Sequence, residues 1–313
     1  HKHVASPIYP LDEKAIARSV EIMDAMNVQT VVNLTGGWGE ELRHNIEKLS
    51  DTYPGRFVVC TLIDWSTIDD PDFSEKAVRS LEEAYRMGAR CLKISKYLGL
   101  YLKDRSSKFV PVNDARLDPI WSKCGELQIP VMIHTADPLA FFRPWDEKNE
   151  AYLSLSRRPE WYFYGTDYQG VLRYTHEELM RQRNDIVARH PETKFVGLHY
   201  ASLSHDLAAV GELLDRYPNL MVEMGARNWA LGSVPNSGGK FALRYQNRIL
   251  FGTDGTIRAV QFAEYIRTLE TDNDLIRFQR PSPWGPIHGL ELPDEVLLKI
   301  YHDNAKKLFP FLE

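Results

Sequence analysis

Residues 131–134 read Val131-Met132-Ile133-His134, a short apolar run that ends in a histidine. Residues 195–199 (Phe195-Val196-Gly197-Leu198-His199) repeat this design, and residues 249–254 (Ile249-Leu250-Phe251-Gly252-Thr253-Asp254) end in an aspartate instead. The sequence begins with His1-Lys2-His3. In a barrel of parallel strands, the C-terminal ends of all strands gather at one mouth. These four stretches therefore predict a site where residues far apart in the sequence surround one cation.

Around these stretches the sequence alternates short apolar runs with amphipathic segments, which is typical of βαβ units and a buried parallel sheet. Strands are predicted at residues 30–34, 57–62, 91–94, 131–134, 195–199, 220–224 and 249–254, and helices at 13–26, 40–53, 73–87, 118–127, 176–190, 203–217, 240–246 and 294–308. A strand needs about five residues, so a first strand is expected to start before His1. Eight strand–helix units predict an α/β fold, a (β/α)8 TIM barrel, as a single domain over residues 1–313. The alternative for His1 and His3 is that they are remnants of a purification tag.

A long insertion, residues 138–175, follows the fifth strand and is rich in aromatic side chains. It lies on the strand-to-helix side, which is the catalytic face of such a barrel, so it is predicted to act as a lid. Trp145 and Arg143 are candidate substrate-binding residues within it. The alternative is a small satellite core that holds the loop down, and the insertion could also serve a homo-oligomer interface.

Charge, hydropathy and cysteine content limit the classes of partner. A net charge of −5, with acidic and basic residues interspersed, gives no reason to expect nucleic acid. No apolar run is long enough to cross a bilayer, so a membrane is not expected either. Cys60, Cys91 and Cys124 predict no disulfide framework and favour a reducing, cytoplasmic compartment, with a periplasmic one left open. The expected partner is a small molecule.

Alternation along a strand predicts which side chains face the barrel interior. In residues 131–134, Val131 and Ile133 are apolar and are predicted to pack against the helices, which places His134 inward. In the same way, Ile249 and Phe251 are predicted to face the helices, which places Asp254 inward. In residues 195–199, Val196 and Leu198 are predicted to face outward, which places His199 inward. His1 and His3 are two residues apart and share a face.

Lys93, in Cys91-Leu92-Lys93-Ile94, is also predicted to point into the barrel. A buried lysine is rare unless it is paired. An ion pair with Glu223, an inward residue of the strand at 220–224, is the favoured explanation. The alternatives are that Lys93 binds an anionic substrate or that it is carboxylated and bridges two metals.

Imidazole nitrogens with a carboxylate oxygen suit Zn²⁺ or another first-row divalent ion. Such an ion lowers the pKa of a bound water to about 7, which yields a nucleophile at neutral pH. Each residue also has a structural explanation, since a lone histidine is often a hydrogen-bonded core residue and Asp254 alone could cap a helix. Several such residues at strand ends, all facing inward, favour the metal site.

The order His1-x-His3, His134, His199 and Asp254 resembles the amidohydrolase superfamily. Residues 88–94, 130–135, 249–254 and 303–305 resemble its amidohydrolase-related branch, which includes metal-dependent hydrolases, sugar lactonases and non-oxidative decarboxylases such as aminocarboxymuconate-semialdehyde decarboxylase. The resemblance covers essentially the whole chain. The sequence departs from the pattern twice: the acidic residue that usually precedes H-x-H is absent because the sequence starts at His1, and Gly255-Thr256 follow Asp254 where an aromatic residue and a proline are frequent.

The resemblance implies that His1, His3, His134 and Asp254 hold one divalent ion, with zinc expected first and manganese as the alternative. It implies that His199 is a second-sphere proton donor or acceptor, or an extra ligand. Asp254 would also accept a proton from the metal-bound water.

Three functions are compatible with the sequence. The leading hypothesis is a metal-dependent hydrolase, in which metal-activated water attacks a carbonyl of a small cyclic ester or amide-like substrate. The runner-up is a non-oxidative decarboxylase (a carboxy-lyase) of an aromatic or muconate-like acid, with Arg227 or Arg143 clamping the carboxylate. The third is a catalytically inactive barrel that binds a ligand.

Overall fold

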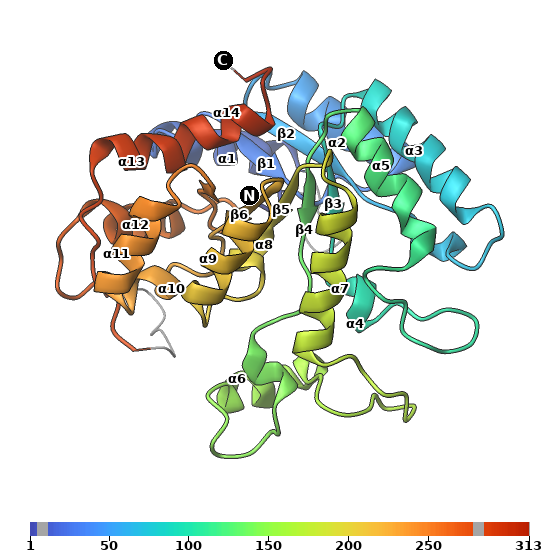
Figure 1. The fold of residues 1–313 in the computed structure, drawn as a ribbon. Helices are drawn as coiled ribbons and strands as arrows, with labels where there is room; N and C mark the ends of the chain where they lie inside the picture. The colour runs from blue at the N-terminus through green and yellow to red at the C-terminus, as the bar shows by residue number, and fades with distance from the viewer. Residues whose placement is uncertain (5–11, 278–284, 313) are drawn as a thin grey trace.

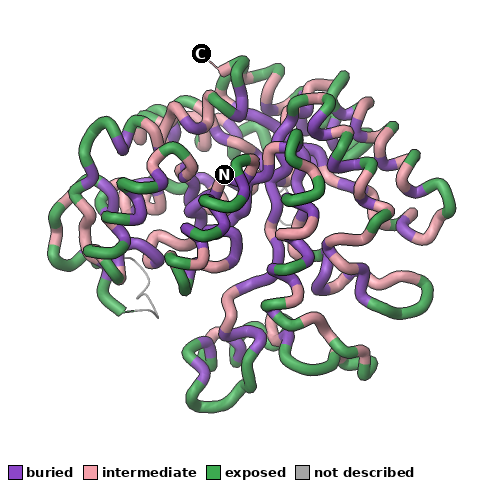
Figure 2. The backbone as a smooth tube through the Cα atoms, viewed as in Figure 1, coloured by how far each residue is buried: buried purple, intermediate pink, exposed green. Residues whose placement is uncertain are grey.

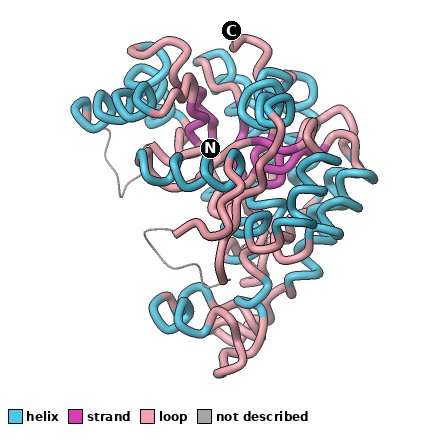
Figure 3. The backbone as a smooth tube through the Cα atoms, turned by 90° about the vertical axis from the view of Figure 1, so that its left-hand side faces the viewer, coloured by secondary structure: helices cyan, strands magenta, loops and turns pink. Residues whose placement is uncertain are grey.

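The computed structural model describes residues 1–4, 12–277 and 285–312, and it shows a curled parallel sheet surrounded by helices (Figure 1, Figure 3). The strands in this part of the chain are β1 (Val31–Asn33), β2 (Phe57–Thr61), β3 (Cys91–Ile94), β4 (Val131–Ile133), β5 (Phe195–Gly197), β6 (Leu220–Glu223) and β7 (Ile249–Leu250). They follow one another in the sheet in chain order, and every neighbouring pair is parallel. The predicted α/β class is confirmed.

The first residues of the chain close the sheet. The Lys2 amide donates to the carbonyl of Val32 at 3.0 Å, and the Leu34 amide donates to the carbonyl of Lys2 at 3.0 Å. On the other side, the His3 amide donates to the carbonyl of Gly255 at 2.9 Å. Residues 1–4 therefore occupy the place of the expected first strand, between β1 and the segment that follows β7, and the predicted barrel is confirmed.

The helices of the described residues include long ones that cover the outside of the sheet and short ones that lie in connecting loops. They are α1 (Glu13–Ala25), α2 (Gly39–Ile46), α3 (Phe73–Met87), α4 (Tyr97–Leu100), α5 (Asp118–Glu126), α6 (Tyr152–Arg157), α7 (His176–Arg189), α8 (Leu198–Ala201), α9 (Leu207–Arg216), α10 (Trp229–Gly232), α11 (Pro235–Arg244), α12 (Ala259–Glu270), α13 (Asp294–Leu298) and α14 (Asn304–Leu308). Capping residues determine where several of these helices begin or end. A capping box of Thr175 and Glu178 starts α7. Gly88, with φ 118°, ends α3 in a conformation that favours glycine.

The apolar core has two layers, because side chains on both faces of the strands are buried. In Figure 2 the centre of the fold is coloured as buried. One cluster receives a side chain from every strand, so it fills the barrel interior: Val32, Val58, Cys60, Cys91, Met132, Val196, Met221 and Leu250. Alternate residues such as Leu92, Val131 and Phe195 pack in a second cluster with the helices. Burial on both faces explains why these strands read as continuous apolar runs.

The predicted side-chain parity of residues 195–199 is wrong. Val196 and Leu198 belong to the interior cluster, so simple alternation would turn His199 outward. His199 reaches the interior because the chain leaves the strand at this point. Residues 199–202 (His199, Tyr200, Ala201 and Ser202) all have positive φ, between 54° and 60°, and form a left-handed turn. Strand β5 accordingly ends at Gly197, two residues earlier than predicted.

Strand β7 is also shorter than the predicted strand at 249–254. It ends at Leu250, where its pairing with Glu223 of β6 ends. The next amide, that of Phe251, donates to the carbonyl of Ile300 at 3.0 Å and so leaves the ladder. Asp254 still lies at this end of the barrel, on a backbone with φ 61°.

Cys60 and Cys91 form a disulfide, contrary to the prediction that the cysteines are unpaired. They are direct partners in the register of the parallel strands β2 and β3, with their Cα atoms 4.4 Å apart. Both side chains face the barrel interior. The pairing was invisible in the sequence because the two residues are 31 positions apart and become neighbours only through the fold. Cys124 is free and buried.

The segment between β4 and α7 leaves the barrel and carries α6, which projects at the bottom of the view in Figure 1. Two short helical turns, Leu139–Phe142 and Pro159–Trp161, lie in the same segment. Its role as a lid stays a prediction. In the described part of the chain, none of the helices combines the length and apolar character needed to cross a membrane.

Candidate metal centre

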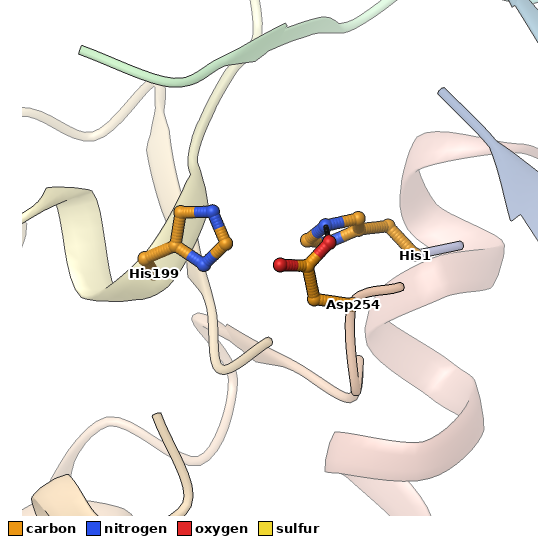
Figure 4. Close-up of side chains that lie close together, drawn as sticks. All are labelled: His1, His199 and Asp254. Carbon is orange, nitrogen blue, oxygen red and sulfur yellow. Dashed lines mark hydrogen bonds and ion pairs between the residues drawn. The ribbon is translucent and has the colours of Figure 1, made fainter. Parts of the chain in front are cut away.

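Ligand atoms of His1, His199 and Asp254 all lie within 4.8 Å of one another (Figure 4). His3 joins them, because its Nε2 and the Nε2 of His1 lie 3.1 and 3.2 Å from the same oxygen, Oδ1 of Asp254. Donor atoms that share one ion at about 2.1 Å are themselves roughly 3 to 3.5 Å apart. The spacing of these nitrogens and this oxygen is compatible with a single divalent ion, and the assignment of His1, His3 and Asp254 as ligands stays a prediction.

Asp254 is held as a carboxylate by the groups around it. Its Oδ1 accepts the backbone amide of Gly255 at 2.7 Å, in addition to the two imidazoles. Burial alone would raise the pKa of Asp254, but the contacts with His1 and His3 hold it far below its usual range. An ionised carboxylate oxygen is the form that binds a cation.

His1 lies between two carboxylates. Its Nδ1 is 2.8 Å from Oε1 of Glu223, and both side chains are 1% exposed. Burial alone would lower the pKa of His1, but Glu223 and Asp254 together raise it to about 9. Because Glu223 binds His1, the predicted ion pair between Glu223 and Lys93 is wrong: no such pair is found among the described residues.

Lys93 does point into the barrel, as predicted, and it is 5% exposed. Burial lowers the pKa of Lys93 to about 7, against the opposing attraction of Asp254 and Glu223. Lys93 is thus close enough to Asp254 and Glu223 to be attracted by both carboxylates.

His199 presents one nitrogen to the centre. Its Nδ1 lies 2.6 Å from the carbonyl oxygen of Gly225, which can only accept, so Nδ1 carries the proton. Burial, with the nearby His134, holds the pKa of His199 well below its usual value. The ring is therefore neutral and leaves Nε2 with a lone pair. The left-handed turn positions this ring opposite His1 and Asp254 (Figure 4).

His134 lies next to this group without being one of the three mutually close donors. Its ring centroid is 4.4 Å from that of His199, and its Nε2 is 3.6 Å from Oδ1 of Asp137. Burial lowers the pKa of His134 to about 4. The other oxygen of Asp137 binds Lys96 at 2.5 Å. Asp137 was missed in the sequence, although its position three residues after a strand-end histidine was a usable signal.

The predicted substrate-binding residues fall in two places. Arg227 follows β6 near the centre, where Asp137 and Asp254 are among the charges that act on it, and its Nε is buried without a partner in the described residues. Arg143 and Trp145 lie in the segment that carries α6. Arg143 is 3.7 Å from Glu150, and Trp145 packs against the rings of Tyr152 and Tyr162.

Lys2 is a further residue that the sequence did not single out. Its side chain points away from His1 and His3 and is 2% exposed. The ammonium donates to the carbonyls of Asp254 at 3.1 Å and Thr256 at 3.0 Å. Lys2 therefore ties the segment that carries the carboxylate to the segment that carries the two imidazoles.

The family model described as Amidohydrolase matches residues 17–311. No curated protein sequence matches this chain.

Several solved structures share the fold, at 14–15% identity. A putative amidohydrolase from Staphylococcus aureus has 15% identity, covers 96% of this chain and 92% of its own, and has a TM-score of 0.56. A 4-oxalomesaconate hydratase from Rhodopseudomonas palustris has 14% identity, coverage of 96% and 82%, and a TM-score of 0.56. A dihydroxybenzoic acid decarboxylase from Polaromonas sp. JS666, solved with bound manganese, has 15% identity, coverage of 95% and 86%, and a TM-score of 0.56.

Proposed function

The chain belongs to the amidohydrolase family, and on that premise we propose that it is an enzyme in which His1, His3, His134 and Asp254 hold one divalent metal ion. The observation that carries the proposal is the convergence of two imidazole nitrogens on one oxygen of Asp254, at 3.2 and 3.1 Å. Zinc is expected first from the nitrogen and oxygen donors. Manganese is the alternative, and one structure of the same fold contains it.

The proposed reaction is hydrolysis of a small cyclic ester or amide-like substrate. A bound divalent ion would polarise the substrate carbonyl and lower the pKa of a water ligand. Asp254 would accept the proton of this water, and its low pKa supports the metal site itself, because it keeps the carboxylate ionised and able to bind a cation. His199 is neutral, with Nε2 open toward the centre, so it can accept and return a second proton.

A substrate with an anionic group fits the charges at the rim. Arg227 offers a guanidinium whose Nε has no partner in the described residues, and Lys93 points into the barrel from β3. A guanidinium binds a carboxylate in a fixed, two-point geometry. We infer that Arg227 orients the substrate and that Lys93 contributes to its binding.

Metal analysis of the purified protein tests the first part of this proposal. Growth with added zinc or manganese should yield about one ion per chain, which a chelator removes together with activity. A protein that binds neither ion would support the third hypothesis, an inactive barrel that binds a ligand. The proposal that a metal-dependent reaction takes place would then be abandoned.

The second candidate function is a carboxy-lyase that acts on an aromatic or muconate-like acid. The observation that favours it is the pair of adjacent neutral imidazoles, His134 and His199, beside the unpartnered guanidinium nitrogen of Arg227. In this reaction Arg227 would hold the substrate carboxylate. One of the histidines would deliver a proton to the carbon atom that loses the carboxylate as carbon dioxide.

Product analysis separates the two reactions. A panel of lactones and aromatic carboxylates should be incubated with the metal-loaded protein, and acid release should be scored against release of carbon dioxide. Ring opening of lactones without carbon dioxide supports the hydrolase. Carbon dioxide from an aromatic acid with no lactone turnover would replace it with the lyase.

A further inference from the structure

Glu223 is a buried carboxylate with a role that the metal ligands alone do not explain. We propose that Glu223 is a positioning residue, which holds the His1 ring in the orientation and tautomer that present Nε2 to the metal ion. This inference rests on the proposed metal site, since His1 is one of its ligands.

The first observation is the contact itself. Oε1 of Glu223 lies 2.8 Å from Nδ1 of His1, and each side chain is 1% exposed. The two atoms form a close ion pair rather than a hydrogen bond of good geometry, since Nδ1 has no hydrogen-bond partner among the described residues. The negative charge of Glu223 favours a proton on Nδ1 and a ring turned toward the carboxylate. The other nitrogen, Nε2, lies 3.2 Å from Oδ1 of Asp254, and without a metal ion it can donate a proton to that oxygen. A cation bound at this position would take the place of that proton. The arrangement matches the carboxylate–histidine pairs that orient metal ligands in other proteins.

The second observation is that the backbone makes room for this carboxylate. A Cβ atom added to Gly252 would lie 1.6 Å from Oε1 of Glu223. A Cβ atom on Gly225 would lie 2.6 Å from the same oxygen and 2.7 Å from Cε1 of His1. The amide of Gly225 also donates to Oε1 at 2.8 Å. Two strand-end glycines therefore leave a gap for one oxygen, and an amide fixes that oxygen beside the imidazole.

The third observation is that the direct contacts of the Glu223 carboxylate among the described residues are with His1 and the Gly225 amide. Burying a carboxylate costs several kcal/mol unless it is paired. Among the described residues, its Oε2 has no hydrogen-bond partner, and Lys93 forms no ion pair with it. The compensation comes from His1 and the Gly225 amide. A cation bound at Nε2 would strengthen it, because it would polarise the Nδ1–H bond.

The test measures metal affinity, which does not depend on turnover. Glu223→Gln keeps the size and one acceptor oxygen but removes the charge, and Glu223→Ala removes the contact. Loss of such an outer partner weakens metal binding about 10- to 100-fold. We expect the glutamine variant near the lower end of this range and the alanine variant near the upper end, in competition titrations of the purified protein with a zinc chelator.

Val222→Ala is the matched control. Val222 precedes Glu223 in β6, is fully buried, and packs with the helices rather than with the interior cluster. This variant should lower the stability of the metal-free protein without changing the zinc affinity. Denaturant unfolding of each metal-free variant separates a loss of folding from a loss of positioning.

A spectroscopic measurement reports on the tautomer directly. In ¹⁵N spectra of the histidine rings in the zinc-loaded protein, His1 should show a slowly exchanging Nδ1–H. Glu223→Ala should lose this signal while the zinc remains bound at saturating concentration.

Two results would overturn the inference. Unchanged zinc affinity in both variants would mean that Glu223 does not support His1, and failure of Glu223→Ala to bind zinc at any concentration would make it a ligand instead. A parent protein that binds no zinc or manganese at all is a different result, because it removes the proposed function itself.

Discussion

Asp254 is the residue on which the candidate centre depends most directly, because one of its oxygens faces both imidazoles of the first segment. Asp254→Asn keeps the shape but removes the negative charge that attracts a cation. We expect the metal content to fall from about one ion per chain to near zero. Elemental analysis after dialysis measures this content. Retention of a full equivalent would exclude Asp254 as a ligand.

His134 and His199 provide a second test, which asks which of the two histidines is a metal ligand. The resemblance implies His134 as a ligand, so His134→Ala should also lose the metal. In the structure, however, His199 is the histidine that joins His1 and Asp254 within 4.8 Å. If His134→Ala keeps its ion while His199→Ala loses it, the ligand role belongs to His199 and the assignment of His134 is wrong.

His176 predicts how stability changes with pH. It is 5% exposed, and its Nε2 lies 3.1 Å from the carbonyl of Ser202. Burial and the neighbouring His205 lower the pKa of His176 from 6.5 to about 4. In this pH interval the unfolded chain binds a proton that the folded protein does not, so stability is lost as the pH falls from about 6.5 to 4.

The size of this effect is at most roughly 3 kcal/mol, at 1.36 kcal/mol for each unit of pKa shift. His176→Gln should remove that part of the pH dependence of unfolding, which urea titrations at pH 7, 5.5 and 4.5 would measure. His44→Gln, at an exposed position, should retain it. Equal pH dependence in the parent and His176→Gln would contradict the assignment.

At the scale of elements, the left-handed turn at residues 199–202 is the least expected feature. Four consecutive residues with positive φ are costly for side chains with a Cβ, at about 1–2 kcal/mol each. Buried contacts hold the turn in place. The Arg183 guanidinium donates to the carbonyl of Ala201, and the Nδ1 of His199 donates to Gly225. Strain at a residue of the candidate site is consistent with a functional constraint.

Replacing one of these residues with glycine should therefore stabilise the protein. Ser202→Gly, at φ 60°, is expected to raise the free energy of unfolding by roughly 0.5 to 1 kcal/mol. Ala17→Gly, within the right-handed helix α1, should instead lower it by about 1 kcal/mol. Chemical denaturation measures both, and destabilisation by Ser202→Gly would show that the turn is not strained there.

The Cys60–Cys91 disulfide gives a prediction about two neighbouring strands. Alkylation of the unfolded protein without a reductant should label only Cys124, whereas alkylation after reduction should label all three cysteines. A crosslink over 31 positions contributes roughly 3 to 4 kcal/mol through the unfolded chain. Reduction should lower the free energy of unfolding by that amount. Labelling of three cysteines without reductant would exclude the bond.

Metal binding should stabilise the whole molecule, because the candidate ligands come from both ends of the sheet. At a hundredfold excess over the dissociation constant, an ion stabilises the folded state by about 2.7 kcal/mol. We expect a rise in melting temperature of roughly 5 °C with zinc or manganese. Asp254→Asn should show no rise. The same shift in that variant would indicate a different binding site.

The sequence predicted the fold well, because burial on both faces leaves an unmistakable apolar run at each strand. Residues 91–94 were predicted with the same bounds that β3 has, and Lys93 was correctly placed inward. Strand ends were less predictable, since hydrogen bonds from elsewhere decide them. The Phe251 amide leaves the sheet for Ile300, which no local pattern indicates.

The candidate site was predictable in part. Residue types at strand ends identified His1, His3 and Asp254, which the structure brings together. The inward position of His199 was predicted for the wrong reason, because strand alternation does not continue through a left-handed turn. The partner of Glu223 was also missed. Lys93 and His1 both point into the barrel, and only three-dimensional distances decide between them.

The closure of the sheet by residues 1–4 has a final consequence. Backbone hydrogen bonds from Lys2 to β1 and from His3 to Gly255 join the first and last margins of the cylinder, and two of the candidate ligands lie in that short join. A cation bound there would link the two edges of the sheet that residues 1–4 join. Separation of residues 1–4 from these edges would then release the ion, and loss of the ion would weaken the closure of the barrel.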